Sequence, residues 1–259
     1  MAPKKVIPLI VLVGPTASGK TSVAIQIAKK FDGEIICADS RTIYKGMDIG
    51  TAKPSTHERQ GIPHHLIDVV DPDEKFTVAE FKRLADSAIA DIRLRGKVPI
   101  LVGGSGLYIN SVIYNYDFIG SDGPRDIQNP RHLHADAPRQ VQKIRSNTVI
   151  FGIEVDRDEL KKRIKDRVEM MVSSGLVNEA TLLASTYGWD IAPMQASAYS
   201  TIKEYIEGSV NLSDAIDNCA LLDGRLAKKQ RTWFKRNKSI QWVDNPSKIV
   251  DFITTLLNN

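Results

Sequence analysis

Runs of apolar residues alternate with helical patterns along the first part of the chain. Val6–Val13 is an unbroken apolar run, which is typical of a strand buried on both faces of a parallel sheet. Thr21–Phe31 has apolar residues at helical spacing, and Glu34–Ala38 predicts a second, short strand. Thr77–Arg95 predicts another helix, and Val98–Val102 a third buried strand. This alternation predicts an α/β fold in which helices flank a parallel sheet.

The pattern changes in two places. Gly46–Pro72 is rich in Gly, Pro, His and Asp, so we expect a long functional loop there. Residues 117–147 contain few apolar residues, and we expect a short insert or lid at the edge of the core. The insert divides the expected core into residues 1–116 and residues 148–259. In the last part we expect a strand at Thr148–Val155, a helix at Arg157–Ser173, and a long helix or helical pair at Ser213–Asn237.

The composition is that of an ordinary globular protein. The chain has 259 residues, of which 42% are hydrophobic and 25% charged, enough for one large α/β domain. Cys37 and Cys219 stand alone, without metal-ligand spacing or a disulfide framework, so we expect a reducing, cytoplasmic compartment. No apolar run approaches the ~18 residues of a membrane-spanning helix, and we expect neither a membrane partner nor a secretory signal.

The strongest motif is a glycine-rich run between an expected strand and an expected helix, which fits G-x-x-x-x-G-K-[ST]. In such a loop the backbone N–H groups converge on phosphate oxygens, and the helix N-terminus adds partial positive charge. Lys20 contributes a full charge, and the Thr21 hydroxyl is placed to bind Mg²⁺. The expected phosphate-binding residues are Gly14, Pro15, Thr16, Ala17, Ser18, Gly19, Lys20 and Thr21.

Two further signals lie where strands are expected to end. Asp39 follows the second strand, at the edge of the sheet where α/β proteins bind ligands. It could hold Mg²⁺, act as a general base, or only cap a helix. Gly103-Gly104-Ser105-Gly106 follows the third strand, where glycines permit close approach to a ligand and the Ser105 hydroxyl can donate to an anion. A purely structural turn would explain these glycines equally well.

Positive charge gathers near the C-terminus. The net charge is only +4, yet the segment from Arg225 to Lys238 contains basic residues and no acidic ones. On a helix, one face would be apolar and dock on the core, and it would consist of Leu222, Leu226, Ala227, Trp233 and Phe234. The other face implies a polyanionic partner, or else a solvated surface, and it would consist of Arg225, Lys228, Lys229, Arg231, Lys235 and Arg236.

Other polar residues carry weaker signals. His64-His65 has no Cys or carboxylate at a metal-ligand spacing, so we expect ordinary loop contacts there. Arg163 and Arg167 lie four residues apart on an expected helix and resemble the lid arginines of phosphate-transfer enzymes. A solvated, salt-bridged helix is the alternative for this pair.

Taken together, these segments resemble the tRNA dimethylallyltransferases. The motifs that carry the resemblance occur in the family's order, and they are Gly14–Thr21, Asp39–Tyr44, Gly46–Pro54, His64–Asp68, Val102–Tyr108, Gly175–Glu179 and Leu226–Phe234. Those enzymes transfer a dimethylallyl group from dimethylallyl diphosphate to N6 of adenosine 37 in tRNA, beside the anticodon. The resemblance implies the same activity here, with Mg²⁺ as cofactor, tRNA and dimethylallyl diphosphate as partners, and a monomeric protein.

The resemblance also implies roles for individual residues. The phosphate loop with Lys20 would hold the diphosphate of the prenyl donor rather than ATP. Asp39 matches the family's general base, and Ser105 stands where the family usually has Thr. The residues that would contact tRNA are Asp39, Ser40, Arg41, Thr42, Ser105, Arg225, Lys228, Lys229 and Arg231.

Three departures from the family pattern are visible. Residues 117–147 replace a longer helical insert, Gly224 stands where the family usually has an arginine, and Ser197-Ala198-Tyr199 replaces Ile-Gly-Tyr. The alternatives to a tRNA-modifying enzyme are an adenylate isopentenyltransferase acting on a free nucleotide, a P-loop small-molecule kinase, and an RNA-binding module without activity. The basic C-terminal helix favours an RNA substrate over a free nucleotide.

Overall fold

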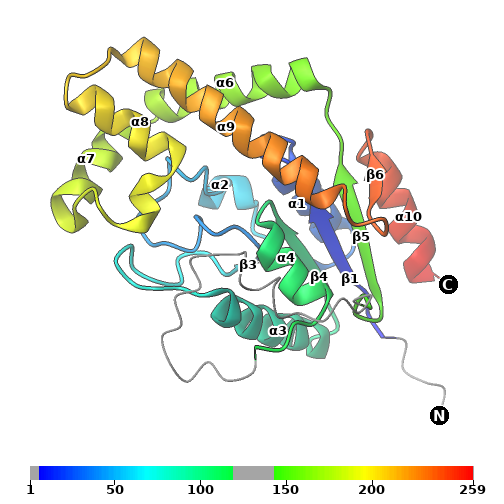
Figure 1. Ribbon diagram of the computed structural model, residues 1–259. Helices are drawn as coiled ribbons and strands as arrows, with labels where there is room; N and C mark the ends of the chain where they lie inside the picture. Colours follow the sequence, from blue (N-terminus) through cyan, green and yellow to red (C-terminus); the bar gives the residue numbers. More distant parts are fainter. Residues whose placement is uncertain (1–5, 119–142, 259) are drawn as a thin grey trace.

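A single parallel sheet forms the centre of the protein, whose computed structural model describes residues 6–118 and 143–258 (Figure 1). Its strand order within these ranges is β3-β2-β4-β1-β5-β6. All neighbouring strands pair in parallel, which confirms the predicted α/β fold. The strands are β1 Leu9–Val13, β2 Gly33–Cys37, β3 His64–His65, β4 Val98–Gly103, β5 Thr148–Ile153 and β6 Gln241–Val243.

The helices expected from the sequence are present, and the last one is a single long helix rather than a pair. None of the helices within the described ranges is long and apolar enough to cross a membrane. Residues 119–142 of the expected insert lie outside those ranges. The helices are α1 Lys20–Lys30, α2 Thr56–Arg59, α3 Val78–Leu94, α4 Gly106–Ile113, α6 Arg157–Ser173, α7 Leu176–Tyr187, α8 Ser197–Ile206, α9 Leu212–Phe234 and α10 Ser247–Asn258, with a 3₁₀ turn at Ala192–Gln195.

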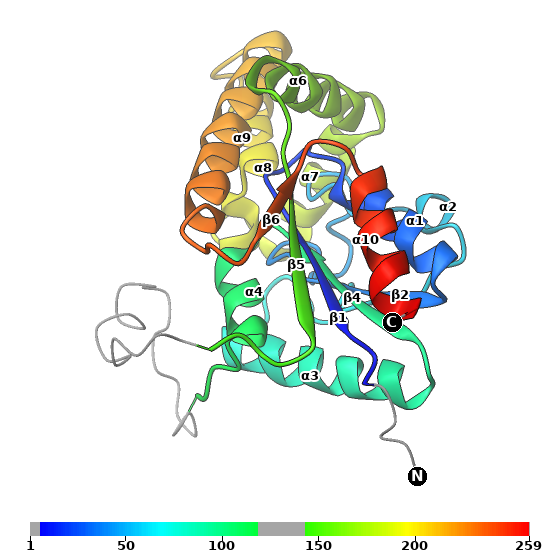
Figure 2. The same ribbon diagram turned by 90° about the vertical axis from the view of Figure 1, so that its right-hand side faces the viewer.

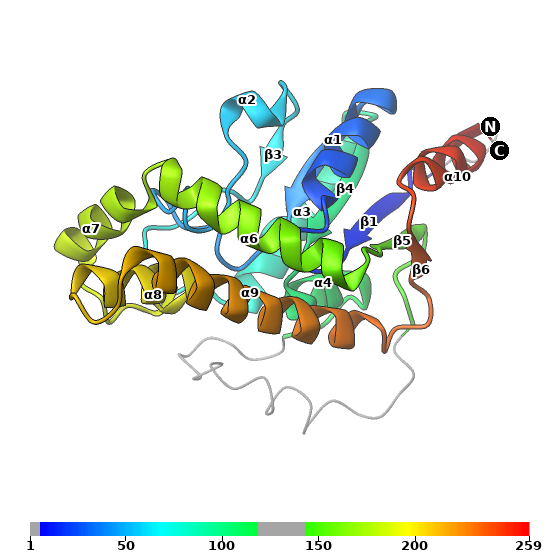
Figure 3. The same cartoon turned by 90° about the horizontal axis from the view of Figure 1, so that it is seen from above.

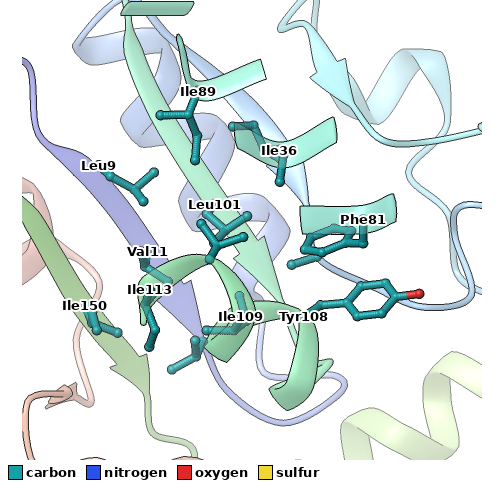
Figure 4. Packing of buried hydrophobic residues seen from close by; sticks show 14 of the residues in the cluster. Leu9, Val11, Ile36, Phe81, Ile89, Leu101, Tyr108, Ile109, Ile113 and Ile150 are labelled. Atoms are coloured by element: carbon teal, nitrogen blue, oxygen red, sulfur yellow. The ribbon is translucent and has the colours of Figure 1, made fainter. Parts of the chain in front are cut away.

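Helices cover both faces of the sheet, which explains why its central strands are apolar throughout. Side chains alternate between faces along a strand. Leu9 and Val11 of β1 therefore pack with α3 and α4, and Figure 4 shows part of this cluster. Ile10 and Leu12 pack on the opposite face with residues of α1 and α10. Figure 2 shows these two helices on one side of the sheet. A strand buried on both faces cannot show alternation in its sequence.

A separate helical layer, α6 to α9, lies over the carboxyl ends of the strands (Figures 1 and 3). Its own apolar cluster includes Val168 of α6, Leu176 of α7, Tyr199 of α8 and Cys219 of α9. Met47, from the long loop after β2, is buried in the same cluster. The loop and the helical layer are therefore packed as one unit above the sheet.

The segment Gly46–Pro72 is more ordered than predicted. It contains the short helix α2 and the edge strand β3, which pairs with Ile35 and Ile36 of β2. His65 Nε2 lies 2.8 Å from a carboxylate oxygen of Glu34, and His64 Nδ1 lies 2.8 Å from a backbone carbonyl oxygen. Both histidines thus make the ordinary contacts expected of them.

Glu179 of α7 holds the start of this segment in place. Its carboxylate accepts the backbone N–H groups of Asp48, Ile49 and Gly50 at 2.8–2.9 Å. It also accepts the Tyr199 hydroxyl at 2.8 Å. A Cβ on Gly50 would come within 2.4 Å of the Tyr199 ring, so this position has room only for glycine. One carboxylate thus satisfies four donors that join the loop to α7 and α8.

We expect Glu179→Ala to lower the free energy of unfolding by about 2–3 kcal/mol, because these donors lose a charged acceptor. Urea denaturation measures the change. Glu204→Ala, at an exposed position of α8, is the matched control and should stay within about 0.5 kcal/mol of the wild type. An effect of Glu179→Ala no larger than that of the control would show that water replaces the carboxylate without loss.

Candidate active site

The glycine-rich loop runs directly from β1 into α1, at the carboxyl edge of the sheet. Gly19 adopts a left-handed conformation with φ 85° and stands at the N-cap of α1, without a side-chain cap. A Cβ on Gly14 would come within 3.1 Å of both the Ile153 carbonyl and the Ser18 hydroxyl. The loop is thus a tight turn that ends at the N-terminus of a helix, the arrangement that binds phosphate groups.

The Lys20 side chain folds back over this loop. Its Nζ donates to the Pro15 carbonyl at 2.6 Å. Burial lowers the pKa of Lys20 to about 8, the nearby Asp39 carboxylate opposes this change, and the Arg167 guanidinium adds to it. The influence of Asp39 and Arg167 on Lys20 shows that the three charges share one site. Thr21 follows as an exposed residue in the first turn of α1.

Asp39 lies just beyond β2, but it does not cap a helix. Its Oδ1 accepts the backbone N–H of Arg41 at 2.9 Å, which forms a local turn. Residues 39–42 are not helical, so the capping role considered for Asp39 is wrong. Its Oδ2 has no hydrogen bond within the described part of the chain. One oxygen thus orients the carboxylate and the other stays available for chemistry.

Ser105 ties the end of β4 to the residue after Asp39. Its Oγ accepts the backbone N–H of Ser40 at 2.9 Å and lies 3.2 Å from the Ser40 hydroxyl. A Cβ on Gly103 would come within 1.9 Å of the Ala38 carbonyl oxygen, and one on Gly104 within 2.4 Å of Gln230 Nε2. Close packing against backbone therefore requires Gly103 whatever ligand the loop binds, whereas a side chain at Gly104 would displace the Gln230 amide.

Two polar residues of the helical layer, Gln230 and Arg167, reach the phosphate loop from above. Gln230 of α9 accepts the backbone N–H of Thr16 at 2.8 Å and donates to the Gly104 carbonyl at 3.2 Å. Arg167 of α6 donates to the Thr16 hydroxyl at 2.6 Å. Arg167 also pairs with Asp223 of α9, which is buried and accepts the Ser197 hydroxyl. The phosphate loop and the Gly103–Gly106 turn are thus held by side chains that lie far away in the sequence.

These contacts decide between the two interpretations of the arginine pair. Arg163 lies on the exposed side of α6 and pairs with Glu159 at 2.8 Å. For Arg163 the alternative of a solvated, salt-bridged helix is therefore correct. Arg167, one turn later, points at the phosphate loop. Gln230 stands inside a recognisable motif, whereas the sequence contains no signal that would single out Asp223.

The docking face predicted for α9 is wrong in part. Ala227 and Phe234 are buried as expected, but Leu226 is 45% exposed and Asp223 is buried in its place. The helix is rotated relative to this prediction because Gln230 has a partner at the phosphate loop and Asp223 is bound by Arg167 and Ser197. A buried polar group with partners can outweigh the burial of one leucine.

The predicted basic face also needs a correction. Arg231 and Lys235 both lie against Glu154, with nitrogen–oxygen distances of 2.7 Å and 3.3 Å. The exposed cations of this face that form no ion pair within residues 6–118 and 143–258 are Arg225, Lys228, Lys229 and Arg236. The positive surface therefore remains, but it is smaller than the sequence suggested, and Arg231 contributes to it only partly.

Comparison with known proteins identifies the family. The model of the IPP transferase family matches residues 42–137 and 128–237, which together make up most of the chain. The chain belongs to the IPP transferase family. This confirms the resemblance to the tRNA dimethylallyltransferases.

Members of the IPP transferase family resemble the chain over nearly its whole length. The tRNA dimethylallyltransferase of Desulforudis audaxviator is 40% identical, with 92% of each chain aligned, and that of Bacillus subtilis is 37% identical, with 92% of this chain and 90% of its own aligned. The first alignment spans 286 positions, more than the 259 residues here, so that relative has residues without a counterpart in this chain.

Solved structures of the family share the fold. The full-length tRNA isopentenylpyrophosphate transferase of Bacillus halodurans aligns with a TM-score of 0.82 at 35% identity, covering 97% of this chain and 96% of its own. A eukaryotic dimethylallyltransferase described as acting on tRNA aligns with a TM-score of 0.73 at 27% identity, covering 87% of this chain and 69% of its own.

Proposed function

We propose that this protein transfers a dimethylallyl group from dimethylallyl diphosphate to N6 of adenosine 37 in tRNA, acting as a monomer in the cytoplasm. The observation that carries the proposal is that Asp39, beyond β2, and Lys20, beyond β1, lie at the same carboxyl edge of the sheet, where the carboxylate raises the pKa of the lysine. The Asp39 carboxylate can accept a proton from the nucleophile. The Lys20 ammonium can stabilise the negative charge that develops on the leaving group.

Asp39 is proposed as the general base. Adenine N6 is a weak nucleophile because its lone pair is delocalised into the ring. As N6 attacks the allylic carbon, the new C–N bond forms and the C–O bond to the diphosphate breaks. A carboxylate that accepts the N6 proton during this step contributes typically 10²–10⁴-fold. The turn through Arg41 holds Asp39 in one orientation before the substrate arrives.

The phosphate loop is proposed to hold the diphosphate and to stabilise the charge that develops on it. Lys20 and the free N–H groups at the start of α1 supply positive potential at that point. Arg167 is also close enough to affect Lys20 and can share this task. Gln230 and Arg167 fix Thr16, so the loop is kept in its binding conformation.

Magnesium fits this site as a partner of the diphosphate. Mg²⁺ usually keeps several waters and binds through one or two protein groups together with substrate phosphates. Thr21 has an exposed hydroxyl in the first turn of α1, and the described residues contain no cluster of three or more metal ligands. A site with one hydroxyl ligand suits such an ion. When bound, it would neutralise charge on the departing diphosphate.

The target adenosine must leave the stack of the anticodon loop before N6 can reach Asp39. Residues Asp39–Thr42 form the wall that it would meet. Arg41 is held there by a hydrogen bond from its guanidinium to the Ala192 carbonyl at 3.1 Å. Thr42 is buried, and its hydroxyl has no hydrogen-bond partner among the described residues.

Transfer of the prenyl group can be measured directly. Labelled dimethylallyl diphosphate is incubated with total tRNA, with free AMP, or with buffer alone, and nucleosides are then analysed. We expect label on N6 of adenosine in tRNA. Label on AMP alone would favour the adenylate isopentenyltransferase, and turnover of ATP without prenyl transfer would favour the kinase.

The exposed cations of α9 are proposed to lie along the RNA backbone. Each phosphate contact releases condensed counterions, so the logarithm of affinity falls with the logarithm of salt concentration, by about 0.7 per contact on single strands. We expect Lys228→Ala with Lys229→Ala to flatten this slope by roughly 1–1.5 and to weaken all tRNAs alike. The measurement is tRNA binding across a salt series.

Lys29→Ala with Lys30→Ala is the matched control for this pair. Both lysines are exposed at the far end of α1, and the double change removes the same charge. It should leave the slope as in the wild type. Identical slopes for all three proteins, with full turnover on tRNA, would show that the basic face of α9 is merely solvated.

A further inference from the structure

A buried lysine in the segment after β2 has no role in the mechanism given above. The side chain of Lys53 is 3% exposed. Its Nζ donates to the Tyr44 carbonyl at 2.7 Å. It also donates to Asp48 Oδ1 at 2.6 Å and to Asp68 Oδ1 at 2.5 Å. An ammonium group has three donors, so each of them is used. Because a buried charge must keep its partners, the lysine holds these three acceptors in place.

The two aspartates come from opposite ends of the loop that follows β2. Asp48 lies near the start of the loop and Asp68 near its end, so the lysine joins the two ends. The end of the loop in turn lies beside the residues that follow Asp39. There the Val69 backbone N–H donates to the Ile43 carbonyl at 2.7 Å. The lysine thus closes the loop onto the segment that carries the proposed base.

A continuous series of hydrogen bonds leads from this lysine to the Asp39 carboxylate. Lys53 Nζ binds the Tyr44 carbonyl. The backbone N–H of Tyr44 donates to the Arg41 carbonyl at 3.3 Å, and the backbone N–H of Arg41 donates to Asp39 Oδ1 at 2.9 Å. Three successive hydrogen bonds therefore connect a buried ammonium group with the carboxylate that is proposed to take the proton.

The position of Asp39 depends on such support, because the residues around it belong to neither a strand nor a helix. Asp39 comes after the end of β2, and residues 40–43 form a turn. A general base must lie within about 2.6–3.2 Å of the atom whose proton it accepts. A displacement of about 1 Å, caused by a change far from the reacting atoms, can cost about 10²-fold in rate. A contact that fixes this turn therefore contributes to turnover.

We propose that Lys53 is a positioning residue for the general base, since it fixes the turn from Asp39 to Tyr44 and closes the loop beside it. This inference rests on the proposed function, because it takes Asp39 as the base. Lys53 does not itself touch the substrate and acts through the backbone of the turn. Its removal should therefore slow the loss of the N6 proton and leave donor binding unchanged.

The test is Lys53→Met, which removes the charge and keeps a side chain of similar length. We expect transfer to tRNA, measured in a single turnover, to slow by about 10- to 100-fold. Calorimetric titration with dimethylallyl diphosphate should give an affinity within about 2-fold of the wild type, with every molecule still binding the donor. A lysine needed only for folding would lower the rate and the fraction of donor-binding molecules in proportion. That result would overturn the positioning role.

A double-mutant cycle with Asp39→Asn shows whether the lysine acts through the base. In the Asp39→Asn background, Lys53→Met should change the rate by no more than about 2-fold, because no base remains to be positioned. Losses that multiply would show that Lys53 acts independently of Asp39, and would overturn the inference.

The single variants separate this inference from the proposed function. A slow Asp39→Asn together with a normal Lys53→Met would reject the positioning role and keep the base. An Asp39→Asn as fast as the wild type would reject both.

Asp68→Asn is a milder variant that tests the same contact if Lys53→Met does not fold. Asp68 has φ 56°, a conformation in which Asn is at ease, and the amide oxygen can still accept from Lys53. We expect a rate between those of the wild type and Lys53→Met. A wild-type rate for Asp68→Asn would overturn the inference in that case.

Lys45→Met is the matched control. Lys45 lies in the same segment and pairs with Asp71 at the surface, at 3.3 Å, so the change removes the same charge without touching the buried contact. It should keep the wild-type rate. A loss as large as that of Lys53→Met would mean that the charge of the segment, and not the buried lysine, sets the rate.

Discussion

Replacement of Asp39 by Ala is expected to lower turnover on tRNA by about 10²–10⁴-fold, the usual contribution of a general base. Binding of dimethylallyl diphosphate should stay near normal, because Lys20 and the phosphate loop are unchanged. The measurement is steady-state transfer together with donor binding at equilibrium. The assay should be run near pH 6.5, since loss of the carboxylate removes the group that opposes the lowered pKa of Lys20.

Asp39→Asn separates the chemistry from the local structure. The amide oxygen can still accept the Arg41 N–H, so the turn is kept while the base is lost. We expect this variant to be as slow as Asp39→Ala. If either variant instead loses donor binding together with Mg²⁺ binding, Asp39 is a metal ligand and not the base.

Lys20→Met should weaken binding of dimethylallyl diphosphate by about 10- to 150-fold, the size expected when one hydrogen bond to a charged group is lost. Binding of tRNA should persist, because the basic face of α9 is untouched. Calorimetric titration with the donor and a separate tRNA-binding assay test both statements. Tight ATP binding with steady hydrolysis, and no competition from dimethylallyl diphosphate, would instead support a kinase.

The pKa of Lys20 adds a dependence on pH. With a pKa of about 8 in the free protein, Lys20 loses its proton as pH rises through 8, and donor affinity should fall in that range. Stability changes in the opposite direction. Between pH 8 and 10.5 the unfolded chain keeps the Lys20 proton while the folded one has lost it, so the free energy of unfolding rises with pH. Lys20→Met should lack both changes.

Much of the fold could be predicted from the sequence, because local patterns carry the information. Apolar runs such as Val6–Val13 specify strands that must be buried on both faces, and α1, α3 and α6 follow from apolar residues at helical spacing. The positions of the phosphate loop and of Asp39 could also be predicted, since each directly follows the end of one strand.

The tertiary structure decided which distant residues complete the site. Arg167 and Gln230 reach Thr16, and Asp223 reaches Arg167, only because α6 and α9 cross above the sheet, and no local pattern encodes that crossing. The same contacts turn α9 about its own axis relative to the orientation predicted from the sequence. Leu226 is therefore exposed although its spacing predicted burial. A prediction from hydrophobic periodicity assumes that the most apolar face of a helix is the one that is buried. Here paired polar groups at the phosphate loop occupy that face, because a buried charge must keep its partner.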